Sequence, residues 1–238
     1  EYVTLLNLLG RYRVAYDRIM AHKFHPWEGG EGKITTQYTV SLTQMARTAL
    51  AAGDAARAKQ LLEQALAFPE NLGEGKLIIA KDNNIHYYLG LAERALGHTA
   101  AAQSELEKAA AGDEEPAGMM YYNDQPADLI LYEGLANRAL GRESRALARF
   151  HKLIDYGEKH IFDSVRIDYF AVSLPDLQLF EEDLDLRSRA HCQYLIALGS
   201  YGLGDFARAR ACYEETLKID CAHEGAILHR QLLKQANG

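Results

Sequence analysis

The sequence feature that most constrains the fold is a short pattern that occurs five times along the chain. In each copy a glycine follows a leucine or an alanine, and another alanine stands five residues after the glycine. Glycine ends a helix readily because it adopts the left-handed conformation without a Cβ penalty, and alanine lets two helices approach closely. Each copy therefore predicts a helical hairpin. The copies are Leu9-Gly10 with Ala15, Ala52-Gly53 with Ala58, Leu96-Gly97 with Ala102, Leu140-Gly141 with Ala146, and Leu203-Gly204 with Ala209.

The apolar residues around the fourth copy follow the helical period on both sides of the glycine. Such a hairpin cannot bury its apolar face alone, so neighbouring hairpins must stack. We therefore expect an all-α fold, a right-handed α-solenoid of tetratricopeptide-like helical-hairpin repeats with long loops between them, in a single domain over residues 1–238. Because the chain opens at Glu1 inside a helical pattern, we also expect it to be a piece of a longer protein. The predicted repeats cover residues 1–24, 36–69, 83–112, 127–157 and 186–237.

Composition limits the setting and the partners of the chain. Its formal net charge of -7 repels phosphate backbones, and no cluster of lysine and arginine overcomes this, which argues against nucleic acid. No stretch reaches the roughly 18 apolar residues of a membrane span. The three cysteines, an odd number, form a poor disulfide framework and favour a reduced, cytoplasmic setting.

The segments between the predicted hairpins are rich in Gly, Pro, Asn and acidic residues. Each follows a second helix, so we expect all of them to gather along one edge of the array. The acidic run 181–185 is interpreted as the cap region of the helix that follows it, where negative charge suits the helix dipole. The four insertions are residues 24–35, 69–83, 113–127 and 156–185.

The fifth copy resembles the tetratricopeptide repeat most closely, in Leu203 to Ala209 and Tyr213 to Leu217. Cys221 stands where that family usually has proline. Successive glycines lie about 44 residues apart, and then about 63, against about 34 in an ordinary tetratricopeptide repeat. The additional residues are therefore placed in the insertions.

Four longer strings give the chain a resemblance to the C-terminal repeat region of bacterial proteins that carry the domain of unknown function 5107. Members of that family resemble two-part proteins in which a β-sandwich, similar to galactose mutarotase, precedes the repeats. The resemblance implies a carbohydrate-related parent protein. The matching strings are His25 to Lys33, Asn71 to Lys76, Tyr121 to Pro126 and Arg166 to Pro175.

The insertions contain the candidate binding residues. Trp27, the only tryptophan, could stack on a sugar ring or anchor a partner, with Glu28 and Glu31 as hydrogen-bond acceptors. Alternatively, Trp27 fills a gap between two hairpins. The third insertion mixes aromatic and amide side chains in the way that suits peptide or hydroxyl-rich ligands, although a loop that packs only on itself explains it equally well. The remaining candidates are Tyr121, Tyr122, Asn123, Asp124, Asp168 and Tyr169.

The sequence does not match the motifs of several other kinds of site. Gly30 to Lys33 and Gly73 to Lys76 lack the outer glycine and the Ser or Thr of a phosphate-binding loop. His191, His223 and His229 stand near the cysteines of the last repeat without zinc-ligand spacing. The loop aspartates, Asp128 included, fit helix caps and turns better than a catalytic carboxylate pair. We thus expect no catalytic residue, metal or cofactor.

The sequence leads to two functional hypotheses. In the first, the chain is a non-catalytic interaction or scaffolding module of a larger bacterial protein, and it binds a protein partner or its own upstream domain. In the second, it is an accessory part of a carbohydrate-active enzyme whose sugar-binding sandwich lies upstream. The binding surface is either the loop-bearing edge or the groove of the array.

Overall fold

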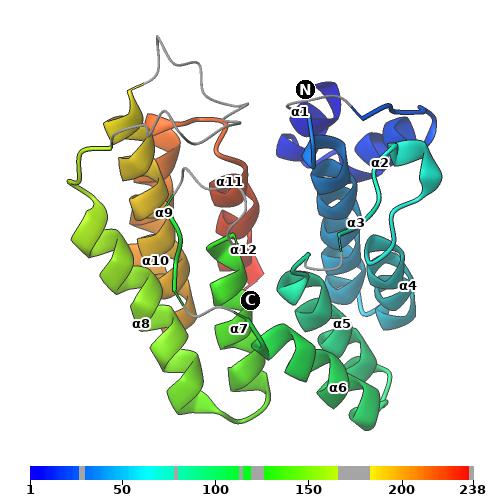
Figure 1. The fold of residues 1–238 in the computed structure, drawn as a ribbon. Helices are drawn as coiled ribbons and strands as arrows, with labels where there is room; N and C mark the ends of the chain where they lie inside the picture. Colours follow the sequence, from blue (N-terminus) through cyan, green and yellow to red (C-terminus); the bar gives the residue numbers. More distant parts are fainter. Residues whose placement is uncertain (27–29, 78–79, 113–114, 119–125, 166–182, 236–238) are drawn as a thin grey trace. The chain divides into compact units, whose positions relative to one another are not determined.

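The computed structural model describes residues 1–26, 30–77, 80–112, 115–118, 126–165 and 183–235, and every regular element within them is helical (Figure 1). The all-α class predicted from the sequence is confirmed for this part of the chain. The helices belong to two compact units, Glu1–Ala111 and Gly112–Gly238, each described by itself below. No helix in the described ranges combines the length and the apolarity that crossing a membrane requires.

Unit 1 contains three helix pairs in succession (Figure 1). The pairs are α1 (Tyr2–Leu8) with α2 (Tyr12–Met20), α3 (Lys33–Ala51) with α4 (Ala55–Ala65), and α5 (Asn83–Ala95) with α6 (Thr99–Ala110), and a 3-10 turn, η1 (Glu70–Leu72), lies between the second and third. The helices of each pair pack together, and the second helix of one pair packs against the first helix of the next. The first helices α1, α3 and α5 also contact one another in order.

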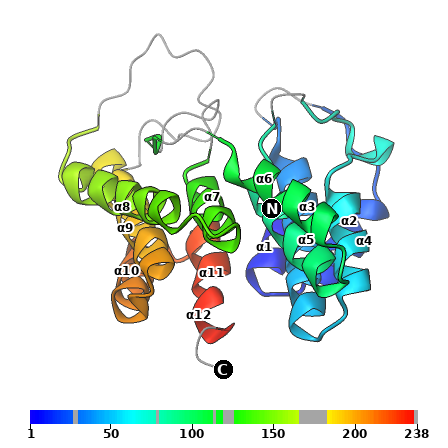
Figure 2. The ribbon, with the colours of Figure 1, turned by 90° about the horizontal axis from the view of Figure 1, so that it is seen from below.

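Unit 2 contains two such pairs and a C-terminal extension. The pairs are α7 (Asp128–Ala139) with α8 (Glu143–His160) and α9 (Leu184–Leu203) with α10 (Phe206–Ile219), and the extension is α11 (Glu224–Arg230) with α12 (Leu232–Gln235). Helix α9 lies between α8 and α10 (Figure 2). Asp183 caps α9 by accepting a 3.0 Å hydrogen bond from the Leu186 N–H, so the described part of the acidic run 181–185 does contain the predicted cap.

All five predicted glycines have left-handed backbone conformation, with φ between 73° and 83°. At Gly141 the glycine N–H donates to the carbonyl oxygen of Arg138, and the N–H of Arg142 donates to that of Asn137, at 3.0 and 2.8 Å. This pair of bonds is the Schellman motif, and the same two bonds occur at the other four glycines. Since the residue after each glycine already caps the next helix, the connection is as short as a helical hairpin allows.

The alanine five residues after each glycine is buried, with at most 3% of its surface exposed. A short side chain at this position lets the second helix lie close against the first and against the next pair. The predicted role of these alanines is therefore confirmed. They are Ala15, Ala58, Ala102, Ala146 and Ala209.

A buried polar network fixes α1 on α3 in unit 1. The Asn7 side-chain amide donates to the backbone oxygen and to the side-chain oxygen of Gln37, at 3.0 and 2.9 Å, and Ser41 donates to Asn7 Oδ1 at 2.9 Å. All three residues are at most 6% exposed. Because a buried amide without a partner costs stability, this network specifies one register between the two helices.

The first two insertions contact each other. The Phe24 N–H donates to the Asn71 carbonyl oxygen at 2.8 Å, and the Asn71 amide donates to two carbonyl oxygens at the end of α2, those of Ile19 and His22, at 2.9 Å. Gly73, at φ +75°, passes so close that a Cβ there would lie 2.7 Å from the Phe24 carbonyl oxygen. For these two insertions, the expected gathering along one edge is seen within unit 1.

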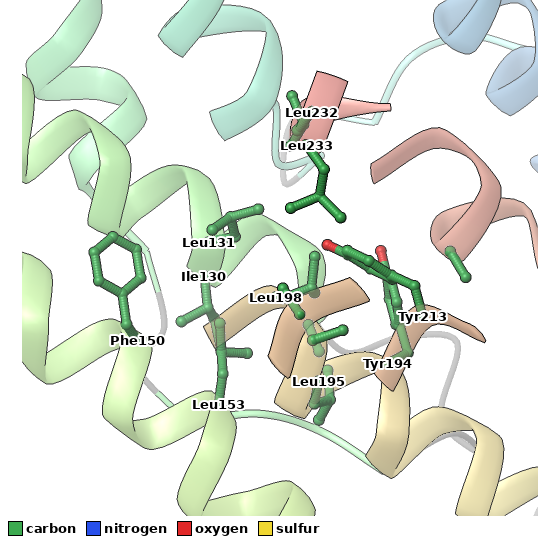
Figure 3. Packing of buried hydrophobic residues seen from close by; sticks show 14 of the residues in the cluster. Ile130, Leu131, Phe150, Leu153, Tyr194, Leu195, Leu198, Tyr213, Leu232 and Leu233 are labelled. Carbon is green, nitrogen blue, oxygen red and sulfur yellow. The ribbon is translucent and has the colours of Figure 1, made fainter. Parts of the chain in front are cut away.

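The core of unit 2 joins both of its helix pairs to the C-terminal extension (Figure 3). Phe150 and Leu153 of α8 are fully buried, and glycines on neighbouring helices make room for Phe150. A Cβ at Gly134 of α7 would lie 2.3 Å from the Phe150 ring, and one at Gly202 of α9 would lie 2.2 Å from it. Because Gly134 and Gly202 have no side chain, α7 and α9 approach Phe150 of α8 more closely than larger residues at these two positions would permit.

We predict that Gly141→Ala lowers the free energy of unfolding by about 1 kcal/mol, because a Cβ is strained in the left-handed conformation while the unfolded chain loses some freedom. Gly141→Asn should lower it less, since asparagine tolerates this conformation. Urea denaturation followed by circular dichroism measures both values. Gly75→Ala, at a glycine with ordinary φ and open space around it, is the control and should change little. Equal stability of Gly141→Ala and the wild-type protein would contradict the role given to the turn.

Candidate functional site

Of the binding residues predicted from the sequence, Glu31 lies within the described residues. Glu31 is exposed and stands at the turn before α3. The N–H of its neighbour Gly32 donates to Glu74 Oε2 at 2.8 Å, so Glu31 lies where the first two insertions meet. The other candidates lie outside the described residues: Trp27, Glu28, Tyr121, Tyr122, Asn123, Asp124, Asp168 and Tyr169.

The described residues contain a different concentration of ionisable side chains, in unit 2. It comes from the start of α7, the middle of α9, and α11 with the residue before it. We call it the histidine cluster and define it as Asp128, His191, Tyr194, His223 and His229. Electrostatic interactions link Asp128 to His191 and Tyr194, and link His223 to both of the other histidines.

His229 joins three helices at the centre of this cluster. The residue is 5% exposed, and its Nδ1 lies 2.8 Å from the Gly225 carbonyl oxygen and 2.9 Å from the Tyr194 hydroxyl. A carbonyl oxygen only accepts, so Nδ1 carries the proton in the neutral ring, and Nε2 accepts from the Tyr132 hydroxyl at 3.0 Å. Through this one imidazole, α11 is held to Tyr132 of α7 and Tyr194 of α9.

His223 precedes α11 and acts as its N-cap. Its Nδ1 accepts a hydrogen bond from the Ala226 N–H at 3.1 Å, and its ring centroid lies 4.8 Å from that of Tyr194. Burial, with smaller effects of the nearby His191 and His229, lowers the pKa of His223 to about 4, while Asp220 opposes the shift. The imidazole is therefore neutral at pH 7.

His191 and Asp128 both adjoin the third insertion: His191 contacts it from α9, and Asp128 follows its last residue. His191 Nε2 donates to the Ala117 carbonyl oxygen at 3.0 Å, before the insertion's undescribed part, and Asp128 begins α7 just after it. Burial lowers the pKa of His191. Although Asp128 as a whole is half-buried, burial of its carboxyl group raises its pKa to about 6, against the opposing effects of its own backbone N–H and of His191.

At neutral pH this site combines one carboxylate, the neutral imidazoles of His191 and His223, the ring of His229 and tyrosine hydroxyls. These groups can donate and accept hydrogen bonds, and clusters of shifted pKa values are enriched at functional sites. No group of three or more His, Cys, Asp or Glu side chains in the described part of the chain has a geometry that could hold a metal ion. The arrangement joins α7, α9 and α11 through buried hydrogen bonds, and His191 contacts Ala117 of the third insertion.

In the sequence, these histidines are candidates only for zinc ligands. Asp128 is a candidate only for a helix cap or a catalytic carboxylate. The cap itself is wrong for Asp128, since the N-cap position belongs to Ala127 and Asp128 is the first residue of α7. One local signal was present, because His191 and Tyr194 stand three residues apart on one helical face. The contacts of α11 with α7 and α9 have no such signal.

No family model matches the chain, and no solved structure matches it.

We predict that Asp128→Asn raises the free energy of unfolding by about 1 kcal/mol at pH 8 and gives no gain at pH 4. Above pH 6 the native carboxylate is charged in a site that disfavours charge. As pH falls from about 6 toward 3.8, the folded wild-type protein takes up a proton that the unfolded chain does not. This uptake stabilises the wild type, so the difference in the free energy of unfolding between variant and wild type disappears. Urea unfolding at both pH values measures the difference. The exposed control Asp155→Asn should leave it unchanged, and a loss of stability in Asp128→Asn at pH 8 would refute the assignment.

Proposed function

We propose that the chain is a non-catalytic interaction module of a larger bacterial protein, built from tetratricopeptide-like hairpins in a right-handed α-solenoid. The observation that carries the proposal is the repeated Schellman turn, present at all five glycines with a buried alanine five residues later. Stacked hairpins of this kind form extended rigid scaffolds whose principal known use is to present surfaces to partners.

The third insertion is the contact surface that we favour. Its described ends are fixed to the scaffold, by the hydrogen bond from His191 to Ala117 and by the start of α7 at Asp128. The residues between them, 119–125, include two tyrosines, an asparagine and a glutamine. Side chains of these types recognise protein surfaces with a small loss of conformational entropy. The partner is therefore a protein, or an upstream domain of the same polypeptide, in the cytoplasm.

A second candidate function is that of an accessory part of a carbohydrate-active enzyme. The residue types of the third insertion favour it, because its aromatic and amide side chains also suit the hydroxyl groups of a sugar. The resemblance to the repeat region of proteins with the domain of unknown function 5107 supports the same setting. In this case the chain would contribute to a sugar site formed mainly by a preceding β-sandwich domain.

Site-specific photo-crosslinking tests the first proposal. We expect a photoreactive amino acid at Tyr121 in the full-length protein, irradiated in the bacterial cells that produce it, to give one predominant protein adduct or an intramolecular crosslink to the upstream domain. Mass spectrometry identifies the product. The same amino acid at the exposed Arg145 of α8 is the matched control and should give neither.

The two candidates predict different results in a parallel glycan-binding measurement. An interaction module gives the crosslink at position 121 and no sugar binding, and Tyr121→Ala removes its partner without changing any turnover by the parent protein. An accessory part of an enzyme gives a change in sugar affinity or turnover in the same variant. Equal labelling at positions 121 and 145 would contradict the contact surface proposed for the partner.

A further inference from the structure

The C-terminal extension of unit 2 consists of two short helices. Helix α11 is only two turns long and packs against α9 and α10, while α12 packs against α11. Its apolar side chains complete the core, because Ala226, Leu228, Leu232 and Leu233 are at most 7% exposed, and Leu232 and Leu233 lie beside the core residues of α7 and α10 (Figure 3). Removal of this extension would open one face of the core, including the ring of Tyr213.

The start of α11 is capped by a group that can be protonated. His223 Nδ1 accepts from the Ala226 N–H, so this nitrogen is unprotonated and the neutral ring carries its proton on Nε2. A second proton can bind only at Nδ1. It would remove the acceptor and place a positive charge at the N-terminus of a helix, where the helix dipole is unfavourable to cations. Asparagine, a strong N-cap, would provide the same acceptor without this response to pH.

We propose that His223 is an acid-sensitive latch whose protonation releases α11 and α12 from unit 2. When α11 detaches, the bridge from His229 to Tyr132 and Tyr194 breaks as well, so the release is cooperative. The event exposes the apolar side of α11 and α12 together with the part of the core that they cover. It concerns the opposite end of unit 2's sequence from the third insertion, and it does not rest on the function proposed above.

The groups that face His223 set the pH at which the latch opens. Burial is the main cause that lowers its pKa, and His191 of α9 and His229 of α11 act in the same direction, while Asp220, from the segment before α11, raises it. Tyr194 of α9 covers the ring. Since the pKa is lowered from 6.5 to about 4, the stabilising contribution is complete above pH 6.5 and is lost as pH falls toward 4.

Hydrogen exchange followed by mass spectrometry tests this latch in the full chain. After correction for intrinsic exchange rates, we expect the amides of residues 224–235 to lose protection by about 30-fold between pH 7.5 and pH 5, the factor that a shift in pKa from 6.5 to about 4 gives. The helices α3, α5 and α8 should keep their protection. Wild-type protein in which 224–235 is equally protected at both pH values would overturn the proposal, and so would simultaneous loss of protection in all helices.

Two substitutions separate the cap from its titration. His223→Asn keeps an acceptor for the Ala226 N–H, so its segment 224–235 should change less than about threefold between the two pH values. His223→Ala removes the acceptor at every pH, so protection should be about fivefold lower at pH 7.5 and should fall little further at pH 5. If His223→Asn loses protection at pH 5 as strongly as the wild type does, another group responds to acid and the latch is refuted.

Discussion

The whole architecture depends on the turn of two or three residues between paired helices. In each turn two backbone hydrogen bonds close the first helix, a glycine takes the left-handed conformation, and the following residue already caps the second helix. This leaves almost no freedom in how the second helix returns along the first. The two helices must then meet at close range a turn and a half later, which is possible because the contact residue is alanine. The stacking of pairs within each unit follows from the faces that these hairpins leave apolar.

Buried polar groups add specificity to this packing. In unit 1 the network of Asn7, Gln37 and Ser41 fixes one first helix on the next. In unit 2 ionisable groups fix the helices against one another. His229 connects α11 with tyrosines of α7 and α9. Burial disfavours charge on these groups, which keeps the imidazole of His223 neutral and makes the Asp128 carboxylate a weaker acid. In unit 2, α11 is thus held against α7 and α9 by groups whose charge depends on pH.

The insertions differ in how the scaffold holds them. The first two are joined to each other through the backbone of Phe24 and Asn71, so they form one surface of unit 1. The third is held by His191 at Ala117 and by the start of α7, beside the histidine cluster. Of this third insertion the structure therefore describes only the contact of Ala117 with α9 and the start of α7, while residues 119–125 lie outside the described residues.

The amino-acid sequence by itself determined the all-α class, the position of every paired turn and the closely packed alanines, because these depend on glycine stereochemistry and on apolar periodicity within about one hairpin. The cap of α9 at Asp183 also depends only on neighbouring residues, because the hydrogen bond joins Asp183 to the Leu186 N–H. Only the tertiary structure decided that His191, His223, His229 and Asp128 meet, since they come from helices up to about 100 residues apart in sequence. Their protonation depends on burial and on neighbouring charges, and neither is defined until the helices have packed.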